Sequence, residues 1–194
     1  MSRNKSFEIP KVLDLAIDVF WHKGYEGCSM QDLVEQLGLS RSSIYETFGS
    51  KEDLYLQALE RYDRQSKQQL AAILYEQGPA KELLLRYFHE VIEYTRRRSC
   101  FMVNASLELA ASHPEVFKRV QANMAENEEA FYQLLERAAQ NGELKGTWNL
   151  KALAQYLVNV MHGITVTTVT AEREMLDNIV RSSLYFLREA EPQG

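Results

Sequence analysis

Apolar residues recur every three or four positions along almost the whole chain, which is the spacing of one face of an α-helix. A first helix is predicted from Pro10 to Gly24, because proline suits the first turn of a helix and glycine suits its end. Its apolar stripe consists of Val12, Leu13, Ala16, Ile17, Val19 and Phe20. The pattern therefore predicts helix from the start of the chain.

Three more helix starts follow at serine residues, a residue type that favours the N-cap position. Ser29 opens a second helix, with Asp32 placed as in a capping box, and Gly38 ends that helix. Ser40 opens a short third helix, and Ser50 opens a fourth that reaches toward Tyr75. The inward-facing residues of the second and third helices are predicted to be Leu33, Val34, Leu37, Ile44 and Phe48.

Later breaks in the pattern predict five further helices, from about residue 80, from about residue 101, and over residues 115–141, 150–170 and 172–189. The β-branched run at 165–170 favours a strand locally, but helix surrounds it and no partner strand is predicted. The expected fold is therefore all-α with about nine helices. We expect an N-terminal three-helix domain over residues 1–52 and a larger helical domain over residues 53–194.

Composition narrows the class of protein. The chain has 194 residues with only 4 Pro and 9 Gly, and no apolar run approaches the roughly 20 residues that span a bilayer. The N-terminus has no apolar signal segment, so a cytoplasmic protein without membrane contact is expected. The net charge of −5 counts mildly against nucleic acid as a partner, although an average over the chain does not describe one patch.

Residues 29–51 have the organisation of a helix-turn-helix. Gly38 permits the backbone angles of a tight turn, so the third helix can cross the second steeply. The outward face of that third helix carries side chains that can form hydrogen bonds in the major groove of DNA. These residues are Arg41, Ser42, Ser43, Tyr45 and Thr47.

The same stretch resembles the signature of the TetR/AcrR family over about residues 10–60. The matching positions occur in order and without gaps: Gly24-Tyr25, Ser29, Leu33, Leu37-Gly38-Leu39-Ser40, Ile44-Tyr45, Phe48, Ser50-Lys51 and Leu54. A weaker similarity to the ligand-binding domain of some members starts at Cys100-Phe101-Met102-Val103-Asn104. The resemblance implies a DNA-binding regulator that also binds a small molecule.

The resemblance assigns a role to each position of this surface. Tyr45 and Lys51 correspond to phosphate contacts, and Arg41, Ser42 and Ser43 correspond to base contacts. For the two serines, a role in forming the turn stays open. With Ser29, Gln31 and Thr47 these residues form the expected DNA-binding set, and Arg3 and Lys5 are expected in a minor-groove arm. Glu46 departs from the family pattern, and two orientations stay open: it points at phosphate and weakens binding, or it faces sideways and pairs with Lys51.

The larger domain is expected to bind an inducer of unknown identity and to form a homodimer through the last two helices. Ligand pockets between helices are largely apolar, so the candidate ligand-binding residues are Phe88, Ile92, Val103, Leu107, Phe131 and Met161. The expected apolar stripes of the dimer interface consist of Leu153, Leu157, Val160, Ile164, Ile179, Val180, Leu184 and Leu187.

Two interpretations of Cys100 stay open. It is either a small core residue or a redox or electrophile sensor, since Arg96, Arg97 and Arg98 precede it and positive charge lowers a thiol pKa. The three arginines themselves are expected to form a solvated helix end. The four histidines lack metal-ligand spacing, so neither a metal site nor a cofactor is expected.

The function expected from these features is sequence-specific regulation of transcription, as a repressor that a small molecule releases from operator DNA. Activation instead of repression stays open. The alternative is a helical ligand-binding or adaptor protein without DNA binding. An enzyme is not expected, because the sequence offers no nucleophile–base set, Gly-rich phosphate loop or metal cluster.

Overall fold

The computed structural model describes residues 7–96 and 98–187, and within them it confirms the all-α prediction. Apart from one isolated antiparallel bridge between Leu144 and Leu187, no strand pairing occurs in these residues. The elements are α1 Ile9–Lys23, α2 Met30–Leu37, α3 Arg41–Phe48, α4 Lys51–Ser66, a π-helix η1 Lys67–Ala71, α5 Ala72–Leu74, α6 Ala80–Thr95, α7 Phe101–Glu108, α8 Pro114–Gln140, α9 Leu150–Thr167 and α10 Arg173–Ser183.

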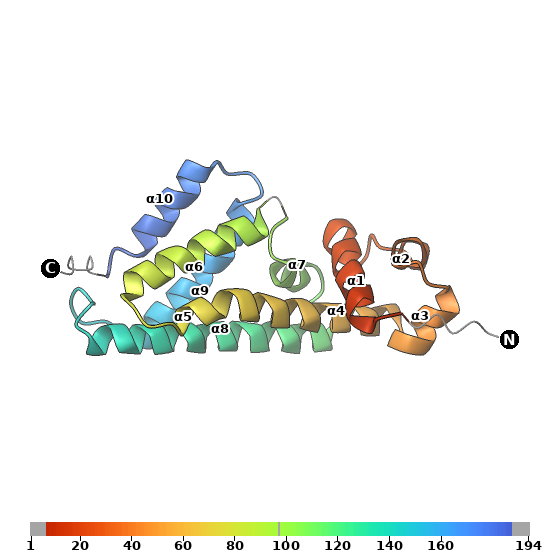
Figure 1. Ribbon diagram of the computed structural model, residues 1–194, viewed down its shortest axis with the longest axis horizontal. Coiled ribbons are helices and arrows are strands. Elements are labelled where there is room, and N and C mark those ends of the chain that lie inside the picture. Colours follow the sequence, from red (N-terminus) through yellow and green to blue (C-terminus); the bar gives the residue numbers. More distant parts are fainter. Residues whose placement is uncertain (1–6, 97, 188–194) are drawn as a thin grey trace.

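Helices α1, α2 and α3 form a small unit at one end of an elongated molecule (Figure 1). Each short helix begins at the serine that the sequence predicts. Ser29 and Ser50 form capping boxes with Asp32 and Asp53, and Ser40 accepts a hydrogen bond from the Ser43 amide. These caps satisfy amides that a helix start otherwise leaves without partners.

A continuous helical stretch over residues 51–74 joins this unit to the rest of the molecule (Figure 1). It consists of α4, η1 and α5, so the predicted long fourth helix is confirmed, with nine helices in the described residues when the stretch counts as one. The wide turns of η1 lie in its middle. Such π-helical segments are uncommon and often lie at functional positions.

Two clusters of buried side chains hold the molecule together. One combines α6, α8, α9 and α10 around Phe88, Phe131 and Leu157, all of which are fully buried. The other combines α1–α4 with Phe101 of α7 and Val120 of α8. Burying one such side chain contributes about 1.5–3 kcal/mol, so α7 and the start of α8 add to the stability of the N-terminal unit. The predicted division at residue 52 stays a prediction.

The C-terminal helices are shorter than predicted. Helix α9 ends at Thr167 instead of residue 170, and α10 ends at Ser183 instead of residue 189. The hydroxyl groups of Thr165 and Thr168 donate to backbone carbonyls three positions earlier. Helix therefore prevails at the start of the β-branched run, and a turn ends it.

The expected apolar stripes of a dimer interface lie mostly inside the subunit. Leu157, Val180, Leu184 and Leu187 are fully buried in its own core, and only Val160 and Ile179 of the set are half-buried. The exposed apolar residues of this region form a different set, namely Trp148, Tyr156, Val166, Val169, Met175 and Tyr185. The helices predicted for dimerisation thus present another face to solvent than the one expected.

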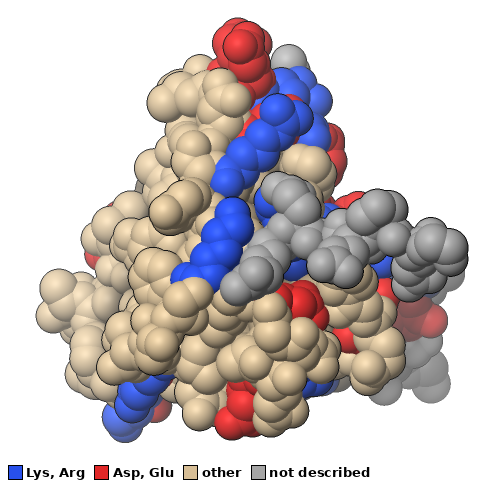
Figure 2. All heavy atoms as spheres, turned by 90° about the vertical axis from the view of Figure 1, so that its left-hand side faces the viewer, with Lys and Arg blue, Asp and Glu red and all other residues tan. Residues whose placement is uncertain are grey.

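Within residues 7–96 and 98–187, every helix lacks the length or the apolar character that a membrane span requires. The charges are unevenly spread over the surface. At the end remote from α1–α3, Lys and Arg side chains cross a largely uncharged face with few Asp and Glu beside them (Figure 2). The net charge of −5 therefore does not describe this face of the molecule.

Candidate DNA-binding interface

Helix α3 is held by its inner face and leaves its outer face free. Ile44 and Phe48 are buried against the α1–α4 core, whereas Arg41, Ser42 and Thr47 are exposed. Gly38 ends α2 with φ 64°, a left-handed conformation that glycine adopts without steric cost, so the chain turns sharply into α3. The geometry required of a groove-binding helix is therefore present.

Tyr45 and Arg41 lie together on that outer face. Tyr45 is 44% exposed although it is a large aromatic side chain. The Arg41 guanidinium lies 5.8 Å from the centre of the Tyr45 ring, at the edge of a cation–π contact. The contact orients the two side chains relative to one another, and both remain exposed to solvent at the surface of α3.

The serine residues at the start of α3 bind one another. The Ser40 hydroxyl lies 3.0 Å from that of Ser42 and 2.8 Å from that of Ser43. Ser43 is half-buried and its amide donates to Ser40. This arrangement gives Ser43 a part in the turn, and Ser42, which is exposed, remains available at the surface.

Helix α2 and the start of α4 flank this face. Ser29 is exposed, but its hydroxyl caps α2 through Asp32, and hydrogen bonds from Lys23 and Ser29 hold the pKa of Asp32 well below its usual range. Gln31 is exposed and donates to Glu35 over 2.8 Å. These two predicted site residues therefore lie at the surface with a partner inside their own helix.

Lys51, the first residue of α4, is held over an aromatic ring. Its ammonium group lies 4.3 Å from the centre of the Tyr25 ring, a cation–π contact that keeps the charge at the N-terminal end of the helix. Backbone amides at a helix start attract anions. Lys51 and this helix end together suit a phosphate group.

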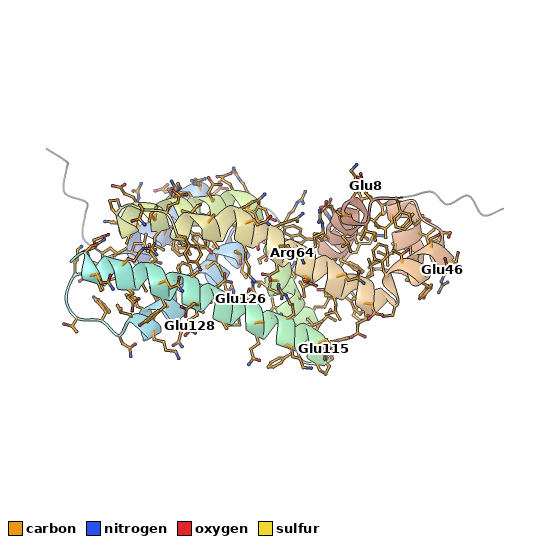
Figure 3. All side chains as sticks on the ribbon, turned by 60° about the horizontal axis from the view of Figure 1, so that its bottom comes forward. Glu8, Glu46, Arg64, Glu115, Glu126 and Glu128 are labelled. Carbon is orange, nitrogen blue, oxygen red and sulfur yellow. The ribbon has the colours of Figure 1, made fainter. Side chains whose placement is uncertain are left out.

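Of the two orientations left open for Glu46, the pair with Lys51 is wrong. Glu46 is exposed, projects from the α3 end of the molecule (Figure 3), and forms no ion pair with Lys51 in the described part of the chain. Lys51 is instead directed to Tyr25. Arg3 and Lys5 of the expected minor-groove arm lie outside the described residues.

Glu108, which the sequence pattern does not predict as a site residue, connects α7 to the helix-turn-helix unit. Its carboxylate accepts hydrogen bonds from the Tyr25 amide over 3.0 Å and from the Glu26 amide over 2.9 Å. The Tyr25 ring in turn contacts the ammonium group of Lys51. Glu108 is therefore linked through Tyr25 to the expected phosphate site. No local sequence signal marks a contact across 83 positions.

The linker between α6 and α7 makes a second tie. The Trp21 indole donates to the Arg98 carbonyl over 3.0 Å, and the Arg98 guanidinium pairs with Asp18 over 3.3 Å. Ser99 turns the chain here with φ 66°. Arg98 is exposed, as expected, and in addition its guanidinium group is bound to α1. Arg97 lies outside the described residues.

Cys100 lies beside this linker and is half-buried. Burial raises the pKa of the Cys100 thiol, although hydrogen bonds from Tyr62 and from backbone amides oppose that effect. The Tyr62 hydroxyl lies 3.5 Å from its sulfur, and the Arg98 side chain is directed to Asp18 instead. This geometry favours the interpretation as a core residue.

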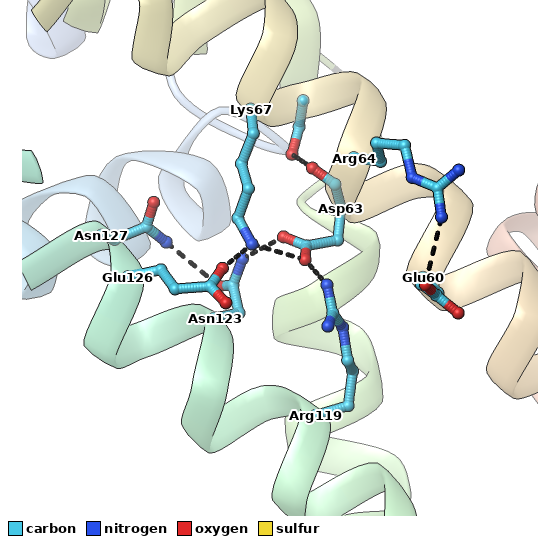
Figure 4. A network of polar contacts seen from close by, with 9 residues as sticks. Glu60, Asp63, Arg64, Lys67, Arg119, Asn123, Glu126 and Asn127 are labelled. Atoms are coloured by element: carbon cyan, nitrogen blue, oxygen red, sulfur yellow. Dashed lines mark hydrogen bonds and ion pairs between the residues drawn. The ribbon is translucent and has the colours of Figure 1, made fainter. Parts of the chain in front are cut away.

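A network of charged and polar side chains links α4 to α8, and the sequence pattern does not predict it. Asp63 is fully buried and accepts hydrogen bonds from Asn123 over 2.6 Å and from Lys67 over 2.7 Å. It also pairs with Arg119, and Lys67 pairs with Glu126 (Figure 4). Burial lowers the pKa of Lys67. In the sequence, Asp63 lies on the polar side of a helix that is expected at the surface. No local signal therefore predicts that its carboxylate is buried and paired.

The predicted ligand-binding residues fall into two groups. Phe88, Ile92 and Phe131 are fully buried in the core, and Met161 accepts a hydrogen bond from the Tyr87 hydroxyl. Val103 and Leu107 line a cavity between α7, α8 and α9. The six residues thus do not line one common cavity, and ligand binding by any of them stays a prediction.

The comparisons with known proteins decide the family. Residues 12–58 match the family of bacterial regulatory proteins named tetR, and residues 80–182 match the tetracyclin repressor-like C-terminal domain. The chain belongs to the TetR family. It is therefore a helix-turn-helix transcriptional regulator, as the resemblance at residues 10–60 implied.

Individual TetR relatives agree over almost the full length. The chain is 36% identical to the uncharacterized HTH-type transcriptional regulator YezE of Bacillus subtilis (strain 168), over 96% of this chain and 100% of YezE. It is 28% identical to the repressor ComR of Escherichia coli (strain K12), over 85% and 81%. A cysteine mutant of the TetR family regulator CifR, solved with 26-base-pair operator DNA, has a TM-score of 0.82, 28% identity, and coverage of 94% and 98%.

Proposed function

We propose that this TetR-family chain is a repressor that binds an operator through α3 and leaves it when an inducer binds. The outer face of α3 carries this proposal, because Arg41, Ser42 and Tyr45 are exposed on a helix whose inner face is fixed. A helix presented in this way fits the major groove. ComR is named a repressor and CifR is solved with operator DNA, which supports both parts of the proposal.

The proposed DNA contacts follow from position and chemistry. Arg41, Ser42 and Thr47 contact base edges from α3, with Gln31 and Ser43 at its margin. Tyr45 and Lys51 contact phosphates, and Ser29 acts by holding the start of α2. Base contacts specify the sequence, whereas phosphate contacts fix the position of the protein.

A homodimer through α9 and α10 completes the proposed repressor. One α3 helix covers too few base pairs, and two copies about 34 Å apart contact successive major grooves. The exposed Tyr156 and Met175 border a crevice of about 650 Å³ on this face, which supports an interface here. Tyr156→Glu is expected to yield monomers in analytical ultracentrifugation, and Tyr75→Glu, also at an exposed tyrosine, is expected to stay dimeric.

The proposed regulator acts in the cytoplasm and has no catalytic role. Its DNA binding is tested by fluorescence anisotropy with fragments of its own promoter region at low salt. The wild type is expected to select one fragment, and Arg41→Ala is expected to lose about tenfold or more in affinity for it, since a bidentate base contact contributes about 1–3 kcal/mol.

Arg64→Ala is the matched control for the DNA-binding test, because Arg64 is exposed on α4 and pairs only with Glu60 in the described contacts. Its affinity is expected to equal that of the wild type. Binding of no fragment by the folded wild type would favour the alternative, a helical ligand-binding protein without DNA binding.

A further inference from the structure

A cavity of about 220 Å³ lies between α7, α8 and α9. Its lining carries no acidic or basic side chain apart from one histidine, and consists of Met102, Val103, Ser106, Leu107, Val120, Asn123, Met124 and His162. Leu107 is 80% exposed and Met124 is 43% exposed, so these two residues form the rim through which a molecule would enter.

The size and lining of the cavity define what it can hold. An apolar protein cavity of roughly 150 Å³ accepts benzene, so this one has room for a single ring with a small substituent. Burial lowers the pKa of His162 and keeps its imidazole neutral at neutral pH, when it offers one donor and one acceptor. A charged ligand would find no counter-charge among the lining residues.

One wall of the cavity belongs to the network that joins α8 to α4. Asn123 lines the cavity, donates to the buried Asp63 over 2.6 Å, and accepts from Asn127 over 3.1 Å. Its polar atoms are therefore already engaged (Figure 4). A molecule that contacts Asn123 is one hydrogen bond away from the carboxylate of α4.

The network is not fully satisfied in this arrangement. The Nε atom of Arg119 is buried without a hydrogen-bond partner in the described part of the chain. A buried donor without a partner costs free energy, so the observed arrangement of the network is less stable than one in which this donor is bonded. Asp63 lies four residues before the wide turns of η1, where the bridging helix departs from α-helical bonding.

We propose that this cavity takes a neutral, ring-sized, mostly apolar molecule with one hydrogen-bonding group, which His162 holds, and that its binding displaces Asn123 from Asp63. The displacement frees the Asp63 end of α4 and so changes the placement of α3. The second step rests on the proposed function, whereas binding to the cavity does not.

Binding is tested by NMR of the full chain with ¹³C-methyl methionine. Met102 and Met124 line the cavity, whereas Met30 lies in α2 and Met175 in α10. Titration with benzyl alcohol is expected to shift the Met102 and Met124 signals and leave the other two in place. Toluene, which lacks the hydroxyl group, is expected to bind more weakly, and benzoate, which is charged, is expected not to bind.

Two variants make the assignment specific. Ser106→Phe fills the cavity and is expected to abolish the shifts, whereas Ala111→Phe on the exposed turn after α7 is expected to preserve them. His162→Phe is expected to bring benzyl alcohol down to the affinity of toluene. Absence of shifts at Met102 and Met124 up to millimolar probe, equal shifts at all methionines, or persistence in Ser106→Phe would each overturn the site.

Coupling to DNA is measured separately, by anisotropy with the selected promoter fragment. Saturating benzyl alcohol is expected to lower DNA affinity roughly 5- to 150-fold, the usual range of allosteric coupling, in wild type and not in Ser106→Phe. Unchanged DNA affinity with an occupied cavity overturns the coupling and leaves the repressor proposal intact. An occupied cavity in a chain that binds no DNA supports the site and overturns the repressor proposal.

Discussion

The two halves of the molecule fix their helix starts in different ways. In residues 29–53, each helix start is capped by a side chain from within three residues, as Ser40 caps α3. In the larger half, Asn149 caps α9 in this way, whereas α6, α7, α8 and α10 have no such local cap. The Ala80 amide at the start of α6 donates instead to Glu143, which is 63 positions away, over 2.6 Å.

This difference suggests that the N-terminal unit holds α3 rigidly, whereas the packing of the larger half can adjust. In the N-terminal unit, short-range caps fix where α2, α3 and α4 begin, and α7 and α8 add long-range contacts to the core behind α3. The larger half depends on contacts between distant segments, such as Asp63 with Asn123, and regions that respond to ligands are drawn from parts with alternative arrangements.

The largest effect is expected at Asp63. Asp63→Ala leaves the charges of Lys67 and Arg119 without their buried partner and is expected to lower the free energy of unfolding by about 3–5 kcal/mol, measured by urea denaturation. Glu60→Ala, one turn earlier on the exposed side of α4, is expected to cost less than about 0.5 kcal/mol. Equal losses of unfolding free energy in the two variants would show that the buried network stabilises the protein no more than an exposed ion pair does.

Lys51→Ala is expected to weaken operator binding about tenfold for all sequences and to reduce the salt dependence of log K by about one charge. The matched control is Lys151→Ala, at an exposed position in the first turn of α9. Anisotropy titrations at several salt concentrations give both quantities. An unchanged salt slope would remove Lys51 from the phosphate contacts.

Glu108→Ala is expected to reduce both stability and DNA affinity. Loss of the acceptor for the Tyr25 and Glu26 amides is expected to cost about 1–2 kcal/mol, and the freed turn no longer holds Tyr25 under Lys51. Glu115→Ala, whose partner is the exposed Lys118, is the control. If stability falls while DNA affinity holds, Glu108 does not position the interface.

The local cap of α3 is expected to contribute less. Ser40→Ala removes the acceptor of the Ser43 amide and is expected to cost about 1 kcal/mol in thermal or urea unfolding. Ser42→Ala removes a neighbouring hydroxyl that caps nothing and is expected to stay within about 0.5 kcal/mol. A larger loss in Ser42→Ala would contradict this view of the turn.

The smallest effect is expected from pH. Because burial lowers the pKa of His162 from its usual 6.5, the unfolded chain takes up the proton more readily than the folded chain. The stability that the neutral side chain contributes is fully present above pH of about 6.5 and is lost as pH falls below it. His162→Gln is expected to flatten the curve of unfolding free energy against pH between pH 7 and 5.

The predictability of the structure follows the same contrast. Serine caps, Gly38 and the period of Leu33, Leu37 and Ile44 are local signals, so the helix-turn-helix, its outward face and the long fourth helix could be predicted. The depth of Asp63, the tie from Glu108 to Tyr25 and the filled core around Phe88 are set by packing between segments far apart in sequence. The period of apolar residues identifies the apolar face of a helix, but it does not show which neighbouring helix or subunit covers that face. For this reason the apolar residues predicted for the dimer interface of α9 and α10 are mostly buried inside the subunit.

The π-helical segment at residues 67–71 holds one residue more per turn than an α-helix accommodates. If that surplus residue migrates along the bridging helix, the residues it passes rotate by about 100°. Migration by one turn toward Lys51 would swing Asp63 out of reach of Arg119 without breaking the helix. The helix that joins the two halves could thus change the rotation of one half relative to the other without losing its backbone hydrogen bonding.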